Sequence, residues 1–217
     1  AVYADAFITN FTDNKFINCR SLSDCEDCHG GGGAIYLNAI SIDSQEPFSN
    51  NIFENCTSSN SGGALFVYCK DKEDEGSRSI RAHKTRITRE SDNYQYAILI
   101  NNCNFTGCQS NIEGGAISSG FNYIEYASGD NDFKLTNCHF TECVSKRGGA
   151  LFFQDGNEDG DEETEIDQCY FINCFASEGE GYAISCRSYK LSITACSFTG
   201  HKRGNVASSH CIVYIEM

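Results

Sequence analysis

The sequence contains little proline, methionine and positive charge, and no tryptophan. One proline and one methionine occur among 217 residues, and 16 Lys and Arg residues oppose 30 Asp and Glu, which gives a formal net charge of -14 at pH 7. A surface with that charge repels nucleic acid and anionic lipid, so we expect neither as a partner. No apolar stretch is long enough to span a membrane, and the first residues lack the features of a signal peptide.

Glycine and cysteine, in contrast, are abundant, with 20 Gly and 14 Cys. Hydrophobic residues make up 40% of the chain and aromatic residues 12%, which is enough to bury a continuous core. Abundant glycine with almost no proline favours many tight, regular turns.

A short pattern, C-x-F-x-x-C, recurs along the chain and aligns on six phenylalanines. These are Phe16, Phe53, Phe105, Phe140, Phe171 and Phe198. An apolar residue lies five positions before each: Phe11, Phe48, Ile100, Leu135, Ile166 and Ile193. The residues two positions before are Asn14, Asn51, Cys103, Cys138, Cys169 and Cys196. The residues three positions after are Cys19, Cys56, Cys108, Cys143, Cys174 and then His201.

Each copy continues with Gly-Gly-Ala and an aliphatic residue. The clear copies lie at 32–35, 62–65, 114–117 and 148–151, a weaker one lies at 181–184, and the last is barely visible near 206–207. The first residues, Ala1-Val2-Tyr3, resemble Ala34-Ile35-Tyr36 at the end of a copy. We therefore expect residues 1–217 to be a single domain and a segment of a longer chain.

The spacing of the apolar residues is close to two, which favours short strands over an amphipathic helix. The alternation changes parity on both sides of the phenylalanine, and each change predicts a bend, so one copy would form a coil of two or three strands. Parallel stacking would place like residues about 4.8 Å apart and bury them as ladders. We therefore predict an all-β parallel solenoid of about six to seven rungs. Its insertions, roughly 38–46, 70–94, 118–132 and 154–165, would cluster along one edge.

The Gly-Gly-Ala-[Ile/Leu] motif with an upstream F-x-x-N resembles the repeat of the polymorphic membrane protein (Pmp-like) family, and the resemblance covers nearly the whole chain. The family implies a right-handed, single-stranded parallel β-helix displayed on a cell surface, with a role in adhesion and no catalytic residues to carry over. The departure is systematic, because a cysteine replaces the family's asparagine, which gives F-x-x-C at residues 19, 56, 108, 143 and 174.

The cysteines of the repeat allow two interpretations. Oxidised, the two within one copy would pair, as Cys103 with Cys108; reduced, they would fill stacked interior positions. The exchange of Cys with Asn14 and Asn51 favours interior ladders, since free cysteine packs as a small buried group. The ladder residues would be Cys19, Cys56, Cys108, Cys143 and Cys174 on one side, and Cys103, Cys138, Cys169 and Cys196 on the other.

Three further motifs lie on the chain. Cys25 and Cys28, in C-x-x-C-H, suit a local disulfide, a metal site or inert thiols, and haem is disfavoured because no enclosing pocket is evident. An acidic segment with the pattern D-x-N-x-D-G-D is either a calcium loop or a solvated loop, and its ligands would be Asp155, Asn157, Asp159 and Asp161. Sequons for N-glycosylation begin at Asn10, Asn55 and Asn104.

These patterns favour a non-catalytic scaffold that presents loops for adhesion or protein–protein interaction, outside the cell or on its surface. Its partners would be proteins, or further copies stacked on the solenoid ends, and it would need no cofactor unless the acidic loop binds calcium. One alternative is an intracellular structural component of a filament or ciliary array. A second is a polysaccharide-active β-helix enzyme, although no pair of carboxylates recurs on adjacent copies.

Overall fold

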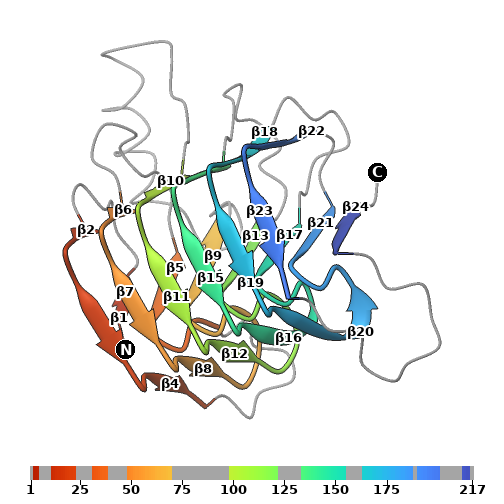
Figure 1. Ribbon diagram of the computed structural model, residues 1–217. Helices are drawn as coiled ribbons and strands as arrows, with labels where there is room; N and C mark the ends of the chain where they lie inside the picture. The colour runs from red at the N-terminus through yellow and green to blue at the C-terminus, as the bar shows by residue number, and fades with distance from the viewer. Residues whose placement is uncertain are drawn as a thin grey trace, which may run out of the picture.

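In the computed structural model, every secondary-structure element of the described residues is a β-strand (Figure 1). The structure describes residues 2–4, 11–22, 31–38, 48–69, 98–121, 133–154, 163–187, 190–200 and 212–215. Within these ranges there is no helix long and apolar enough to cross a bilayer.

The strands form four sheets, and all the strand pairs are parallel. They are named after their places in Figure 1. The front sheet holds the phenylalanines: β3 (Lys15–Ile17), β7 (Ile52–Glu54), β11 (Asn104–Thr106), β15 (His139–Thr141), β19 (Tyr170–Ile172) and β23 (Ser197–Thr199). The lower sheet follows it in each repeat: β4 (Arg20–Ser21), β8 (Thr57–Ser58), β12 (Gln109–Ser110), β16 (Val144–Arg147) and β20 (Phe175–Glu180).

The other two sheets complete each repeat. The rear sheet begins after Gly-Gly-Ala: β1 (Val2–Ala4), β5 (Ile35–Asn38), β9 (Leu65–Cys69), β13 (Ile117–Phe121), β17 (Leu151–Gln154), β21 (Ile184–Arg187) and β24 (Val213–Ile215). The upper sheet leads into the next phenylalanine strand: β2 (Phe11–Thr12), β6 (Phe48–Ser49), β10 (Ile98–Asn101), β14 (Phe133–Thr136), β18 (Glu163–Asp167) and β22 (Lys190–Thr194).

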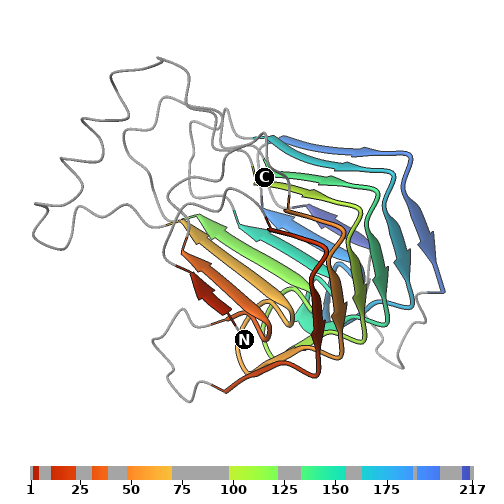
Figure 2. The same ribbon diagram turned by 90° about the vertical axis from the view of Figure 1, so that its left-hand side faces the viewer.

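Each sheet therefore collects one strand from successive repeats, as the turned view in Figure 2 shows. This confirms the prediction of an all-β fold with stacked parallel strands, and the arrangement is compatible with a parallel β-solenoid. We expected two or three strands per copy, and the structure has four, one in each sheet. The serine after the second cysteine belongs to a short strand of its own, as Ser110 does in β12.

The phenylalanines form one continuous stack inside the front sheet. Phe53 pairs with Phe105, and Phe105 pairs with Phe140, in exact register. The ring centroids of these two pairs lie 4.8 and 5.0 Å apart and the rings are nearly parallel. The three side chains are fully buried, whereas Phe16 and Phe198 at the two ends of the stack are only partly buried. Every repeat thus covers the aromatic core of its neighbour.

The corners on either side of the front sheet are made by residues in the left-handed region. Asn102 has φ 51° and Asn137 has φ 52° before β11 and β15, and Gly107 has φ 62° after β11. A residue in this conformation changes the face to which the following side chains point. Asparagine and glycine adopt the conformation at the lowest cost. These corners explain the parity changes that predicted bends in the sequence.

The glycine pair forms the corner before the rear sheet. Gly114 has φ 60°, so a side chain would be strained there. A Cβ on the next residue, Gly115, would collide with the backbone oxygen of Gly149 in the following repeat. The pair recurs because the first glycine turns the chain and the second lets adjacent repeats approach.

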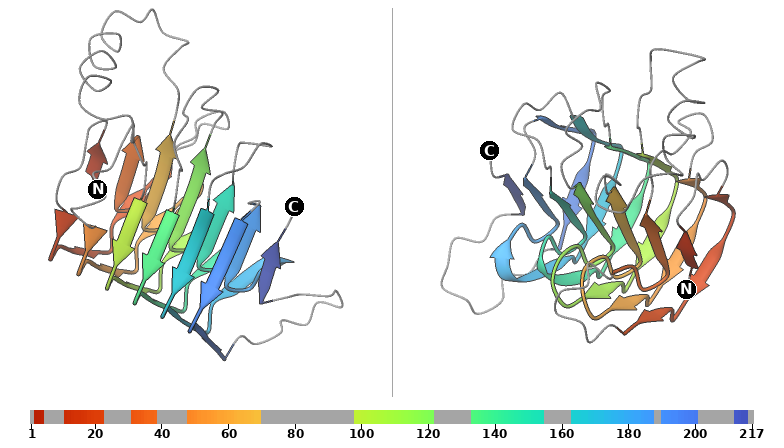
Figure 3. Two further views of the ribbon diagram at one scale, coloured as in Figure 1. Left: turned by 90° about the horizontal axis from the view of Figure 1, so that it is seen from above. Right: turned by 180° about the vertical axis from the view of Figure 1, so that it is seen from behind.

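Strands β1 and β24 form the two ends of the rear sheet. Val2 and Tyr3 pair with Ile35 and Tyr36, as the likeness of the two segments predicted. The last rear strand, β24, pairs with β21, and positions 206–207, where the last Gly-Gly-Ala copy is barely visible, lie outside the described residues. Strand β13 also continues to Phe121, into residues expected to belong to an insertion, because it pairs along its whole length with β9. Figure 3 shows β24 at the end of the rear sheet.

We expect Phe105→Ala to lower the free energy of unfolding by about 3–5 kcal/mol, because it removes a buried ring held between two others. Phe16→Ala is the matched control. It should lower the free energy of unfolding clearly less, since Phe16 is partly exposed and has a neighbouring ring of the phenylalanine stack on one side only. Chemical denaturation measures both. Equal losses would contradict the continuous stack.

Candidate functional site: two columns of cysteines

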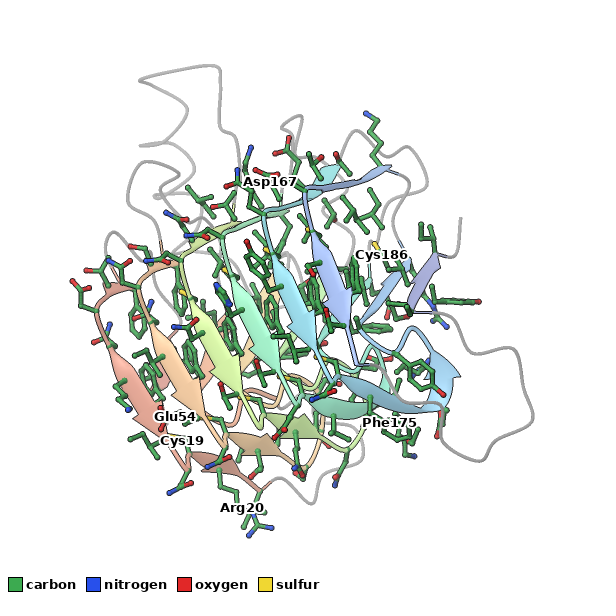
Figure 4. The ribbon with its side chains drawn as sticks, viewed as in Figure 1. Cys19, Arg20, Glu54, Asp167, Phe175 and Cys186 are labelled. Atoms are coloured by element: carbon green, nitrogen blue, oxygen red, sulfur yellow. The ribbon has the colours of Figure 1, made fainter. Side chains whose placement is uncertain are left out.

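The recurring cysteines lie at the two corners of the front sheet. The first column, between the upper and front sheets, consists of Asn14, Asn51, Cys103, Cys138, Cys169 and Cys196. The second column, between the front and lower sheets, consists of Cys19, Cys56, Cys108, Cys143 and Cys174. Figure 4 labels Cys19 near the lower corner and Asp167 near the upper one. The front strands separate the two columns, so the two cysteines of one repeat lie at different corners.

The ten cysteines whose side chains the structure describes are free thiols. Nine belong to the columns, and the tenth, Cys186, lies in the rear sheet opposite Phe153. The inner column cysteines are at most 1% exposed, while Cys19 and Cys196 at the column ends are partly exposed. The columns therefore join the core along its whole length; the first is partly exposed at both ends, at Asn14 and Cys196, and the second at Cys19.

The first column accepts backbone hydrogen bonds from the preceding repeat. The Asn14 N–H donates to Asn51 Oδ1 at 3.0 Å, and the Asn51 N–H donates to Cys103 Sγ at 3.4 Å. The N–H groups of Cys138 and Cys169 donate to the sulfur of the next repeat, at 3.4 Å in each case. A buried N–H left without an acceptor costs about 1–3 kcal/mol, so these side chains stabilise the corner.

The same side chains also donate to backbone carbonyls. Asn51 Nδ2 donates to the Phe11 carbonyl at 2.8 Å, and Cys103 Sγ lies 3.6 Å from the equivalent carbonyl of Phe48. Cysteine and asparagine are therefore interchangeable in this column because each has one donor and one acceptor in the same places. The sequence suggested apolar packing as the reason for the exchange of cysteine with asparagine. The structure adds hydrogen bonding as a second reason.

The second column uses its thiols as donors. Cys108 Sγ lies 3.7 Å from the Phe53 carbonyl, and Cys143 Sγ lies 3.6 Å from the Phe105 carbonyl, so each thiol reaches back one repeat. Burial raises the pKa of the Cys143 thiol well above its ordinary value, and hydrogen bonds with the neighbouring thiols act in the same direction. Because the thiolate is the reactive form, the buried Cys143 thiol is a structural group rather than a nucleophile.

An exposed amide ladder runs beside the first column, and the sequence comparison missed it. Asn102 Nδ2 donates to Asn50 Oδ1 at 2.7 Å, and Asn137 Nδ2 donates to Asn102 Oδ1 at 3.1 Å. These are the left-handed corner residues, so one asparagine both turns the chain and bonds to its neighbours. In the sequence, the sign of this ladder is that Asn50, Asn102 and Asn137 each lie directly before a residue of the first column.

Charged side chains on the outside form pairs between repeats. Lys15 lies 3.0 Å from Glu54, and Lys146 lies 3.4 Å from Glu178. Two further ion pairs join Lys134 with Glu165 and Arg147 with Glu113. Four carboxylates are thus each matched to a cation rather than to another carboxylate, and no group of metal-ligating side chains occurs in the described part of the chain.

The remaining predicted sites divide into two groups. Asn55 and Asn104 are exposed, and Asn104 lies on the front sheet with Thr106 facing the same way. Asn55 lies at a left-handed corner, where its Oδ1 rests against Gly107 of the next repeat. The other predicted residues lie outside the described ranges: Asn10, Cys25, Cys28, Asp155, Asn157, Asp159 and Asp161.

We expect Cys103→Asn to change the free energy of unfolding by less than about 1 kcal/mol, since asparagine retains the donor and the acceptor. Cys103→Ala at the same position should cost about 1–3 kcal/mol, because the Asn51 N–H loses its acceptor. Urea denaturation of the two variants compares them directly. An asparagine variant as damaged as the alanine variant would refute the proposed equivalence.

Alkaline pH should destabilise the fold through the buried Cys143 thiol. Its pKa is raised, mainly by burial, so the unfolded chain loses this proton at lower pH than the folded chain does. The stability that this thiol contributes is fully present below about pH 9 and falls as the pH rises beyond it, by up to about 1.4 kcal/mol per pH unit. Melting curves from pH 7 to 10.5 test this, and a flat profile above pH 9 would disprove it.

Comparison with known proteins adds no relative from which a role could be carried over. No protein-family model, curated protein or solved structure matches this chain. The residues themselves form a core of stacked rings and buried thiols, and chain segments of very different length connect its strands.

Proposed function

We propose that this chain is a non-catalytic scaffold on the cell surface, which presents its connecting segments for adhesion or protein–protein interaction. In this proposal the four sheets are the faces of a right-handed parallel β-helix of about six to seven rungs of the Pmp-like type. The regular part of each repeat supplies rigidity, and the segments between the rear and upper sheets supply recognition.

The observation that carries the proposal is the unequal length of equivalent connections. The strand register places Tyr68, Gly120, Gln154 and Arg187 in one row of the rear sheet. It also places the first residues after each connection, Ile98, Phe133, Thr164 and Leu191, in one row of the upper sheet. All four connections therefore start and end at equivalent points along one edge.

The shortest of these connections needs only residues 188–190 to join Arg187 to Leu191. The equivalent connections elsewhere are residues 69–97, 121–132 and 155–163. Their additional length is not needed to close the stack. Long segments of this kind in a compact domain are most often retained for binding, because connecting segments carry recognition on a rigid support.

The core supports a display role in a second way. Its inner cysteines are buried, and four carboxylates on its surface are paired with cations of neighbouring repeats. A stack of this kind holds its edge at a fixed geometry, as a scaffold for adhesion requires. An extracellular or surface location, with protein partners, remains part of the proposal.

A second candidate is a structural component that assembles end to end, for example in a filament or ciliary array inside the cell. The observation that favours it is the partial exposure of Phe16 and Phe198 at opposite ends of the phenylalanine stack. A further copy could continue the stack at either end. Such assembly would need the ends of the molecule and not the long connections.

The two candidates predict opposite effects of shortening one connection. We expect a variant with residues 69–97 replaced by Ser-Tyr-Lys, the sequence of 188–190, to keep or gain up to about 2 kcal/mol of stability, because loop closure becomes less costly. Under the display proposal, binding of the labelled protein to cultured cells and extracellular-matrix proteins should fall at least tenfold.

The matched control shortens residues 121–132 in the same way, which separates the contribution of one connection from that of the edge as a whole. Surface labelling of intact source cells, with antibody detection, supplies the location. Unchanged cell binding by every shortened variant, or complete protection of the protein inside intact cells, would reject the display proposal. Concentration-dependent fibres that persist in the shortened variants would favour end-to-end assembly.

A further inference from the structure

We infer that Cys169 and Cys196 form a thiol–disulfide site. A small-molecule disulfide such as oxidised glutathione oxidises the pair, and the resulting disulfide bond links the last phenylalanine repeat to its neighbour. This inference does not depend on the proposed function. It concerns a pair from adjacent repeats, whereas pairing within one repeat would have to bridge the two corners of the front sheet.

The two residues are already held one repeat apart in register. Strands β19 and β23 pair Tyr170 with Ser197 directly after the two cysteines. The Cys169 N–H donates to Cys196 Sγ at 3.4 Å, so the second sulfur lies over the first residue. Parallel strands place such residues about 4.8 Å apart, within the 4.4–6.8 Å between Cα atoms that disulfides span.

This pair differs from the inner pairs of the first column in access. Cys196 is partly exposed, whereas Cys103 and Cys138 are fully buried and closed to a reagent of glutathione size. Strand β23 is the terminal strand of the front sheet and pairs on one side only. It can therefore adjust its position as the bond forms, while an inner strand is held from both sides.

The chemistry proceeds in two exchanges. The Cys196 thiolate attacks one sulfur of oxidised glutathione, the S–S bond of glutathione breaks, and one glutathione thiolate leaves and takes up a proton. The Cys169 thiolate then attacks Cys196 Sγ, which forms the Cys169–Cys196 bond and releases the second glutathione. Two protein thiols are oxidised by two electrons, and one glutathione disulfide is reduced to two thiols.

Burial and the nearby carboxylate of Asp167 make the Cys196 thiolate less available, so the first exchange should be slow at neutral pH and faster at higher pH. The bond would tie the terminal edge of the stack to the repeat before it. The inner thiols would stay reduced, so one molecule would combine an oxidised end with a reduced core.

The test equilibrates the full chain with reduced and oxidised glutathione at pH 8, then blocks free thiols and maps tryptic peptides by mass spectrometry. The expected product joins peptide 191–202, which contains Cys196 alone, to peptide 148–187, with fragment ions placing the bond on Cys169. The equilibrium constant for this bond should be at least tenfold larger in the native chain than in urea, because the fold holds the two thiols together.

Two controls keep the result specific. Cys196→Ser changes a partly exposed end residue, should fold, and should leave Cys169 reduced at every glutathione ratio. The inner pair Cys103–Cys138 in the same sample should remain unlinked. A persistent glutathione adduct on Cys196 without the cross-link, an equal equilibrium constant in urea, or cross-linking of Cys103 to Cys138 under the same conditions would overturn the inference.

Discussion

The structure depends on the registration of like residues one repeat apart. Every strand pair is parallel, and the phenylalanine strands pair in register, so the hydrogen bonds of one repeat are completed by the next. This constraint acts on side chains as much as on the backbone. In the front sheet a phenylalanine is fully buried where another phenylalanine lies on each side, and its exposure rises where the stack ends. Stability in such an arrangement comes from neighbour contacts that add along the axis.

The corners show how the same constraint selects residue types. A left-handed residue turns the chain, and the residue after it points its N–H inward, where only the side chain of the next repeat can accept it. Asparagine and cysteine both meet that requirement. The cysteines are therefore part of the hydrogen-bonded framework, and burial shields them from reagents except where a column reaches solvent.

A framework of this kind separates stability from recognition. The amino-acid sequence of the regular strands can vary little, because each side chain contacts the equivalent side chains of two neighbouring repeats. The connections between the rear and upper sheets have no such restriction, and the short link at 188–190 indicates how little chain the stack requires there. This separation is why the proposed function is assigned to the connections and the inferred redox chemistry to one end of a column.

Periodicity along the chain was sufficient to predict an all-β fold, parallel stacking, the aligned phenylalanines and the equivalence of Val2 with Ile35. These features repeat, and a repeated local pattern can be read without knowing what it contacts. The number of strands per repeat and the amide ladder of Asn50 and Asn102 required the tertiary structure. The physical reason is that short strands and corner hydrogen bonds exist only between repeats, so no single copy contains the partner that defines them.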